Sequence, residues 1–275
     1  MKKEVKLITN DKTINLTDFE NFMYLDYVEN DVQINSNTTE INGVDGVLTG
    51  ASTFAPFELE LNFIFSGVDI KDYHLFKSKL RSIVYQREPY YVWHSDMPGK
   101  KYAVLPSATE IEDLYSRNGK VTLKFTVFKG YSESLRDTIE IELLQENVQF
   151  EQGLDLADKL KYKHFEKSFS IFNGSTDIID PLKRHKLIIQ MTIEAPNGFK
   201  IRNKTTGDTF EYKKKIKKSQ SFILNGVYPY VDKKRVGIDT NYSYITLAPG
   251  LNNIVIEGDG TEKIEIDFNF NYIYR

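Results

Sequence analysis

Three consecutive residues, His94-Ser95-Asp96, combine the side-chain types of a hydrolase triad. In such a triad the histidine takes the proton of the serine hydroxyl while the aspartate orients the imidazole, so the three side chains must converge. Consecutive residues of an extended segment instead point to alternate sides. The segment also lacks a Gly-x-Ser-x-Gly turn, and Pro98-Gly99 lies just beyond it. The pattern therefore favours a loop over a catalytic triad.

Carboxylates two residues apart occur in three places, Glu58/Glu60, Glu140/Glu142 and Glu265/Asp267. Two carboxyl groups on one strand face could serve as the acid and the nucleophile of a glycosidase. Each pair, however, alternates with apolar residues, which is typical of the solvated face of a half-buried strand. Because the same pattern recurs in three segments, ordinary outer faces are favoured over a catalytic pair.

Other residues that could carry chemistry are few. The chain has no cysteine, which excludes disulfides, thiol nucleophiles and cysteine-ligated metals. The four histidines, which show no metal-ligand spacing, are His74, His94, His164 and His185. Asp259-Gly260 is too short for a calcium loop and is typical of a hairpin turn. The sequence therefore predicts no catalytic, cofactor-binding or metal-binding residues, and a protein that is not an enzyme.

The charged residues also indicate no extended surface for nucleic acid or membranes. The strongest basic cluster is Lys213–Lys218, where we expect a solvated hairpin, with a contact to an anionic partner as the alternative. The formal net charge of the whole chain is only −3, which argues against binding nucleic acid or an anionic membrane over the whole surface. No apolar run approaches the ~18 residues of a membrane span, and no apolar region follows the N-terminal charges. We expect no signal peptide.

The elements that must position these residues are mostly strands. Aromatic residues make up 13% of the chain, and phenylalanine and tyrosine favour strands. Alternation of apolar and polar residues is clearest in Phe57–Phe65, Lys120–Phe128 and Ile264–Tyr274. Shorter strands are predicted at Ile139–Leu143, Leu187–Ile193, Ser221–Leu224, Tyr244–Leu247 and Asn253–Glu257.

One segment has helical periodicity instead. Asp69 can cap a helix over about residues 69–85, in which Tyr73, Phe76 and Leu80 recur at helical spacing and which Pro89 stops. A shorter helical turn is predicted around Asp155–Tyr162. The sequence thus predicts an all-β protein with one good helix packed on a sheet.

The length of 275 residues suits two domains of ordinary size. A polar, charged stretch at Ser132–Thr138 is the best candidate boundary, because strand and turn signals are dense on both sides of it. We therefore expect two β-rich domains, over residues 1–135 and 136–275.

Turn and strand motifs follow one another in a distinctive order. In the first half they are Ile41–Gly46, Phe54–Phe57, Gly67–Asp69, Arg87–Val92 and Asp96–Tyr102. In the second half they are Tyr162–His164, Phe172–Gly174, Asp180-Pro181, Asn203–Asp208, Asp239–Asn241 and Leu247–Asn252. Their order and spacing, from about Thr13 to the end, resemble the distal tail proteins of long-tailed, siphovirus-like bacteriophages of Gram-positive bacteria. Gln149–Leu154 departs from the resemblance, because relatives often carry a tryptophan and an additional glycine there.

The resemblance implies a structural protein of a phage or prophage tail. It implies an N-terminal β-sandwich that closes into a homohexameric ring, and a peripheral C-terminal β-sandwich like those of galectins and carbohydrate-binding modules. The ring would form the hub of the virion tail tip, assembled in the host cytoplasm. Its implied partners are the major tail tube protein, a lysin-like tail-tip protein and receptor-binding proteins, with DNA passing through the lumen and neither a membrane nor a cofactor involved.

A carbohydrate-binding β-sandwich that recognises host cell-wall sugar is the main alternative. Such a site needs exposed aromatic platforms with polar groups nearby. The tyrosines that could supply such platforms are Tyr228, Tyr230, Tyr242 and Tyr244. A tyrosine that alternates with other residues in a strand, however, more often packs against the protein core. A glycosidase that uses the paired carboxylates is a third hypothesis. The mass in solution separates a ring from a monomeric binding module.

Overall fold

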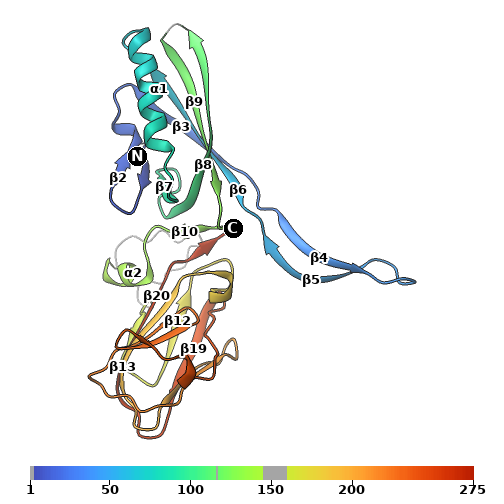
Figure 1. Ribbon diagram of the computed structural model, residues 1–275, viewed down its shortest axis with the longest axis vertical. Coiled ribbons are helices and arrows are strands. Elements are labelled where there is room, and N and C mark those ends of the chain that lie inside the picture. The colour runs from blue at the N-terminus through green and yellow to red at the C-terminus, as the bar shows by residue number, and fades with distance from the viewer. Residues whose placement is uncertain (1–2, 116, 145–159) are drawn as a thin grey trace. The chain divides into compact units, whose positions relative to one another are not determined.

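The computed structural model describes residues 3–115, 117–144 and 160–275 (Figure 1). The chain divides into two compact units, one of Met1–Glu133 with Arg275 and the other of Ser134–Tyr274. Both are built mainly of antiparallel strands, so the predicted β-dominated fold is confirmed. Among the described residues, no helix is both long and apolar enough to cross a membrane.

The first unit is built on seven antiparallel strands in the order β2-β1-β7-β8-β9-β6-β3. Their bounds are β1 Val5–Ile8, β2 Thr13–Asn15, β3 Phe22–Glu29, β6 Phe57–Ser66, β7 Tyr90–His94, β8 Lys100–Tyr115 and β9 Asn118–Val127. A short 3₁₀ turn, η1 (Leu16–Asp18), follows β2, and the short strand β10 (Ser132–Ser134) pairs with β8.

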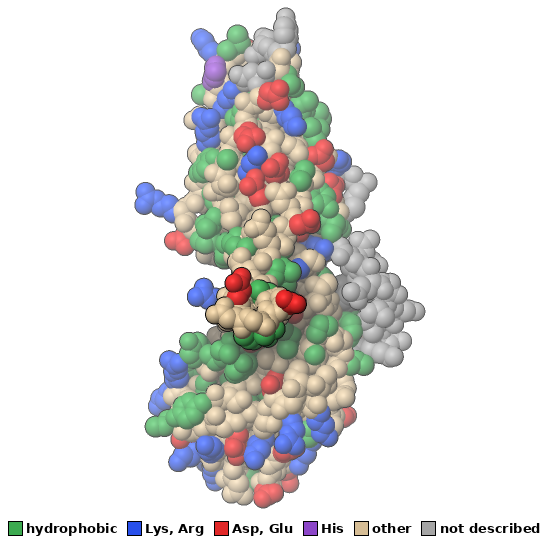
Figure 2. Space-filling model, turned by 90° about the vertical axis from the view of Figure 1, so that its right-hand side faces the viewer, with side chains coloured by type: hydrophobic (Ala, Val, Ile, Leu, Met, Phe, Trp, Pro, Cys, Tyr) green, Lys and Arg blue, Asp and Glu red, His purple; other side chains and the backbone are tan. Residues whose placement is uncertain are grey.

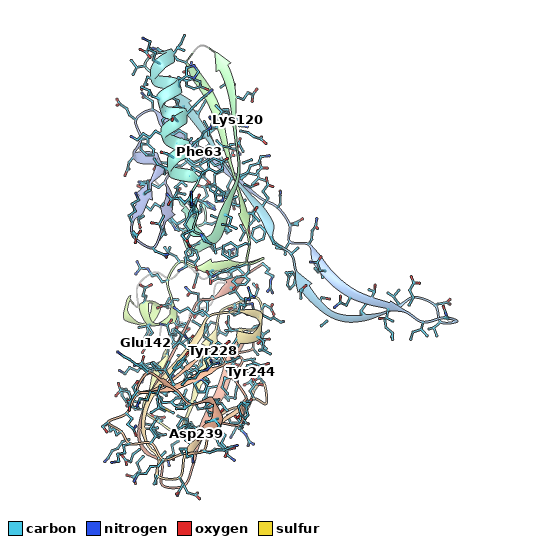
Figure 3. The ribbon with its side chains drawn as sticks, viewed as in Figure 1. Phe63, Lys120, Glu142, Tyr228, Asp239 and Tyr244 are labelled. Carbon is cyan, nitrogen blue, oxygen red and sulfur yellow. The ribbon has the colours of Figure 1, made fainter. Side chains whose placement is uncertain are left out.

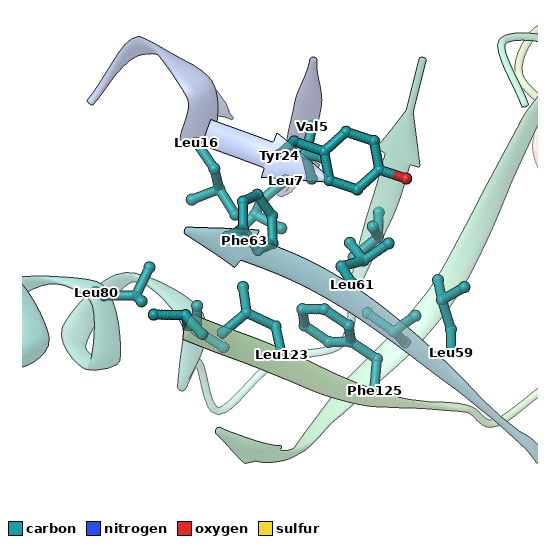
Figure 4. Close-up of a cluster of buried hydrophobic side chains, with 14 of the residues drawn as sticks. Val5, Leu7, Leu16, Tyr24, Leu59, Leu61, Phe63, Leu80, Leu123 and Phe125 are labelled. Carbon is teal, nitrogen blue, oxygen red and sulfur yellow. The ribbon is translucent and has the colours of Figure 1, made fainter. Parts of the chain in front are cut away.

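The two strands with the clearest alternation, β6 and β9, lie side by side as neighbours. They pair from Phe57 opposite Val127 to Ser66 opposite Asn118. Alternate residues of both strands are buried in one apolar cluster, with Phe63 among them (Figure 4). Period-2 alternation therefore identifies both strands to within two residues at each end.

Helix α1 (Ile70–Val84) covers the apolar face of this sheet. The Asp69 carboxylate caps the helix by accepting a hydrogen bond from the backbone N–H of Asp72 at 2.8 Å. Phe76 stacks on Phe65 with ring centroids 3.7 Å apart. The predicted helix is confirmed, and it ends before Pro89.

A long hairpin extends the β3–β6 pair. Strands β4 (Ile34–Glu40) and β5 (Val47–Phe54) pair only with each other (Figure 1). At its base, the Ala55 N–H donates to the Gln33 carbonyl at 2.9 Å, so the ribbon continues out of the sheet. Every residue of 33–54, which we call the arm, is exposed.

The second unit is a β-sandwich. One sheet has the order β11-β20-β13-β16-β17-β18 and the other has the order β12-β19-β14-β15. Phe222 of β16 contacts Phe199 of β14 and Phe210 of β15, with ring centroids 5.0 and 5.7 Å apart, so the two sheets share a core. The bounds of the first sheet are β11 Lys163–His164, β13 Leu187–Glu194, β16 Phe222–Asn225, β17 Tyr228–Val231, β18 Lys234–Arg235 and β20 Glu262–Phe270. Those of the second sheet and the remaining elements are β12 Ser168–Asn173, β14 Phe199–Asn203, β15 Thr209–Tyr212, β19 Gly250–Glu257, β21 Ile273–Tyr274, η2 Pro181–Lys183 and η3 Gly237–Asp239.

The strand predicted at Ile139–Leu143 is wrong, because this segment lies in helix α2 (Thr138–Leu144). The Asp137 side chain accepts a hydrogen bond from the Glu140 N–H at 3.1 Å, as a helix cap does. The cap decides the structure, since a short alternating run fits either a strand or a helix.

The strand predicted at Tyr244–Leu247 is also absent, although Ile245 and Leu247 are buried as its pattern requires. The Thr246 N–H donates to the Asp208 carboxylate at 2.8 Å rather than to a neighbouring strand. Leu247 makes one isolated bridge, to Ile179. The helical turn predicted around Asp155–Tyr162 lies largely outside the described residues.

Candidate assembly surfaces

The segment His94-Ser95-Asp96 does not form a triad. Ser95 Oγ accepts a hydrogen bond from the Glu4 N–H at 3.0 Å, and the Ser95 N–H donates to the Glu4 carbonyl at 2.9 Å. His94 ends β7 and points into the core, where its Nδ1 lies 3.4 Å from the Tyr24 hydroxyl. The serine and the histidine thus face different partners, with Ser95 in the turn that follows β7.

Burial dominates the chemistry of His94. The side chain is fully buried, its ring stacks on Tyr102, and its Nε2 has no hydrogen-bond partner among the described residues. Burial lowers the pKa of the imidazole to about 4, although the negative charge of Asp96 opposes the shift. A buried neutral imidazole of this kind contributes to packing and is a weak base at neutral pH.

The Glu58/Glu60 pair lies on the outward face of the sheet of the first unit. Lys124 Nζ lies 3.2 Å from the carboxylate of Glu60, 2.9 Å from that of Glu110 and 3.9 Å from that of Glu58. The hydrogen bonds that the Lys124 ammonium donates to Glu110, the larger effect, and to Glu60 raise the pKa of Lys124. The pair therefore belongs to a surface ion-pair network, and Figure 2 shows acidic and basic side chains interspersed on this unit.

The Glu140/Glu142 pair lies on a helix rather than on a strand. Residues two apart on a helix point about 200° apart, so these carboxylates do not share a face. The Glu142 carboxylate instead accepts hydrogen bonds from the backbone N–H groups of Tyr162 and Lys163, at 2.8 and 3.1 Å. Glu142 therefore anchors the chain where β11 begins.

The Glu265/Asp267 pair lies on β20 beside Lys163. The Lys163 ammonium lies 2.6 Å from the Glu265 carboxylate and lowers its pKa through a hydrogen bond. Burial raises the pKa of Asp267. The two groups thus differ in protonation tendency, but the lysine fixes Glu265 in an ion pair on an outer sheet face.

The basic cluster Lys213–Lys218 lies in the connection between β15 and β16. The hairpin formed by β14 and β15 turns at Gly207-Asp208, and its return strand ends at Tyr212, before the lysines. Five exposed lysines flank the buried Ile216, which bridges to Ala195. The cluster is a solvated loop anchored by one apolar residue. Over the described residues, no group of three or more His, Asp or Glu side chains could hold a metal ion.

The four tyrosines considered for sugar binding have different environments in the second unit, where Figure 3 labels Tyr228 and Tyr244. Tyr230 and Tyr244 are half-buried. The Arg235 guanidinium lies 4.3 Å from the centre of the Tyr228 ring. Tyr242 is 77% exposed at a φ of 57°, in a turn fixed by Asn241, whose amide donates to the Thr209 carbonyl at 2.8 Å. Of the four tyrosines, Tyr228 and Tyr242 are therefore the exposed ones that could serve as a platform.

The arm is the surface that sequence reasoning missed. Its strands lack regular alternation, although the Asn42-Gly43 and Asp45-Gly46 turn signals mark its tip. Several large apolar side chains of the arm are exposed, and they are Ile34, Ile41, Val44, Val47, Leu48 and Phe54. At its base the Arg275 guanidinium lies 3.9 Å from the centre of the Phe54 ring. A two-stranded hairpin with exposed apolar residues is marginal in water unless another surface covers it.

Residues 2–127 match the family model of the phage tail protein RIFT-related domain. The first unit is thus similar to this phage tail family. No protein of curated function matches the chain by sequence. The whole chain shares its fold with the crystal structure of SPP1 Dit (gp 19.1), described as a paradigm of the hub adsorption apparatus in phages that infect Gram-positive bacteria. That alignment covers 98% of this chain and 99% of SPP1 Dit, at 13% identity and a TM-score of 0.69.

A structure of the phage P2 baseplate in its activated conformation with Ca also aligns, over 98% of each chain, at 9% identity and a TM-score of 0.45. The sequence resemblance to siphovirus distal tail proteins is confirmed by the domain match and by the fold of SPP1 Dit. The first unit is therefore similar to a phage tail domain, and the whole chain has the fold of SPP1 Dit.

Proposed function

We propose that this chain is a phage tail protein that forms a homohexameric ring at the tail tip, and that the ring joins the tail tube to the tip proteins. The observation that carries the proposal is the arm, in which 22 consecutive residues, 33–54, are exposed. A subunit of a closed ring must present surface that neighbours cover, and a projecting hairpin with apolar side chains is such a surface.

The proposal includes the tail tube protein, a lysin-like tip protein and receptor-binding proteins as partners, and DNA as passing cargo. A chain with a net charge of only −3 suits a channel through which DNA slides without binding. The ion-paired Lys124 network supports this role, because its one lysine is surrounded by three carboxylates.

The mass of the purified chain in solution tests the ring. We expect a species of six times the chain mass of 31.9 kDa. A variant in which a short Gly-Ser turn replaces residues 34–54 should stay folded, with an unchanged strand signal in circular dichroism, but remain monomeric. A wild-type chain that stays monomeric at all concentrations would overturn the proposal.

A further inference from the structure

We infer that the exposed face of helix α1 in one copy is the docking site for the arm of a second copy. This inference rests on the proposed ring and names the surface that the arm covers. The helix face is a stripe of Lys71, Leu75 and Lys79, all exposed and spaced four residues apart on one side of the helix.

The two surfaces carry opposite charge. The arm, residues 33–54, contains two acidic residues, Glu40 and Asp45, and no lysine or arginine. Helix α1 contains four basic residues and one acidic residue. Opposite charge on two surfaces of one chain favours pairing between copies and steers their encounter.

The side-chain chemistry of the two surfaces also matches. Glu40 of β4 lies directly opposite Val47 of β5, so an acidic and an apolar side chain stand together near the arm tip. Figure 2, in which the arm points toward the viewer, shows acidic and hydrophobic side chains together on it. The stripe offers the complement, because Leu75, 68% exposed, stands between two lysines.

The dimensions are compatible as well. Leu75 lies four residues from Lys71 and from Lys79, which is about 6 Å along the helix axis at 1.5 Å per residue. Opposite residues of an antiparallel pair, such as Glu40 and Val47, are about 5 Å apart. The tip end of the arm can therefore place Val47 against Leu75 with Glu40 beside Lys71 or Lys79.

Charge exchange tests this contact in the full chain. The variant Glu40→Lys/Asp45→Lys, and separately Lys71→Glu/Lys79→Glu, should each require roughly tenfold more protein to form the ring, because like charges then oppose each other. Combining all four substitutions should restore assembly. The matched control Lys213→Glu/Lys214→Glu changes two exposed loop lysines of the second unit and should assemble like the wild type.

Cysteine pairing provides a second measurement, since the chain has no cysteine of its own. A mixture of Val47→Cys and Leu75→Cys chains should form disulfide-linked dimers under mild oxidation. A mixture of Val47→Cys with Leu182→Cys, an equally exposed leucine of the second unit, should not.

The outcomes separate the two proposals. A ring that needs the arm but tolerates Lys71→Glu/Lys79→Glu and yields no Val47–Leu75 cross-link would overturn this docking site and leave the ring intact. Additive damage in the fourfold variant would also overturn it. A wild-type chain that forms neither ring nor cross-link would overturn the docking site and the proposed ring together.

Discussion

His94 illustrates how a residue with catalytic potential serves packing instead. Its imidazole is enclosed by Tyr24, Tyr27 and Tyr102, with ring centroids 4.4 to 6.2 Å away. One ring nitrogen faces the Tyr24 hydroxyl and the other has no partner among the described residues. Sequence could identify the residue type, but only the fold determines that this histidine is buried and held neutral.

This burial predicts a pH-dependent stability. At pH 7 the imidazole is mostly neutral in both the folded and the unfolded state. Between its ordinary pKa of 6.5 and the folded-state pKa of about 4, the unfolded state binds a proton and the folded state does not. Stability therefore falls as pH falls between these values, by about 2 kcal/mol between pH 7 and pH 5. Urea unfolding at the two pH values measures the difference.

The variant His94→Phe keeps an aromatic ring against Tyr102 and removes the titrating group. Relative to the wild type, it should lose less stability between pH 7 and pH 5. The variant His74→Phe, which changes an exposed histidine of α1, should retain the wild-type pH dependence. An equal slope in the wild type and His94→Phe would show that other groups carry the effect.

At the scale of elements, helix α1 is fixed to the sheet through Tyr73 and Gly119. A Cβ added to Gly119, at the start of β9, would lie 2.1 Å from the Tyr73 hydroxyl. We expect Gly119→Ala to destabilise the first unit by roughly 1–3 kcal/mol, because the ring or the strand must shift. Removing the hydroxyl in Gly119→Ala/Tyr73→Phe should recover part of this loss in chemical denaturation.

Gly237→Ala provides the matched control, since no atom lies within 4 Å of the added Cβ and the backbone is not in the left-handed region. Its unfolding midpoint should stay close to that of the wild type. Additive effects of Gly119→Ala and Tyr73→Phe would contradict a direct contact between these two residues.

The same elements show which parts of the fold the sequence can predict. Strands β6 and β9 and helix α1 were predictable because each buries one regular face, which alternation or helical spacing records. Helix α2 was not, since its alternating residues also fit a strand and its cap from Asp137 decides between them. The arm left no periodic pattern because it buries neither face within the chain.

The candidate surfaces also include parts that the sequence can predict and parts that it cannot. Sequence correctly favours outer faces for Glu58/Glu60 and Glu265/Asp267, since alternation records the buried side of each strand. It does not record which lysine neutralises a carboxylate, because Lys124 and Lys163 come from other strands. Surfaces made for another copy of the chain are the hardest to predict, because their burial occurs only on assembly.

At the scale of the whole molecule, the two units should have separate roles. Each has its own buried core, and the arm and helix α1 both lie in the first unit. We therefore expect residues 1–133 alone to form the ring, and residues 134–275 alone to fold as a monomer. Solution mass and circular dichroism of the two fragments test this expectation. A ring-forming second fragment, or a folded first fragment that stays monomeric while the full chain assembles, would assign the ring contacts to the second unit.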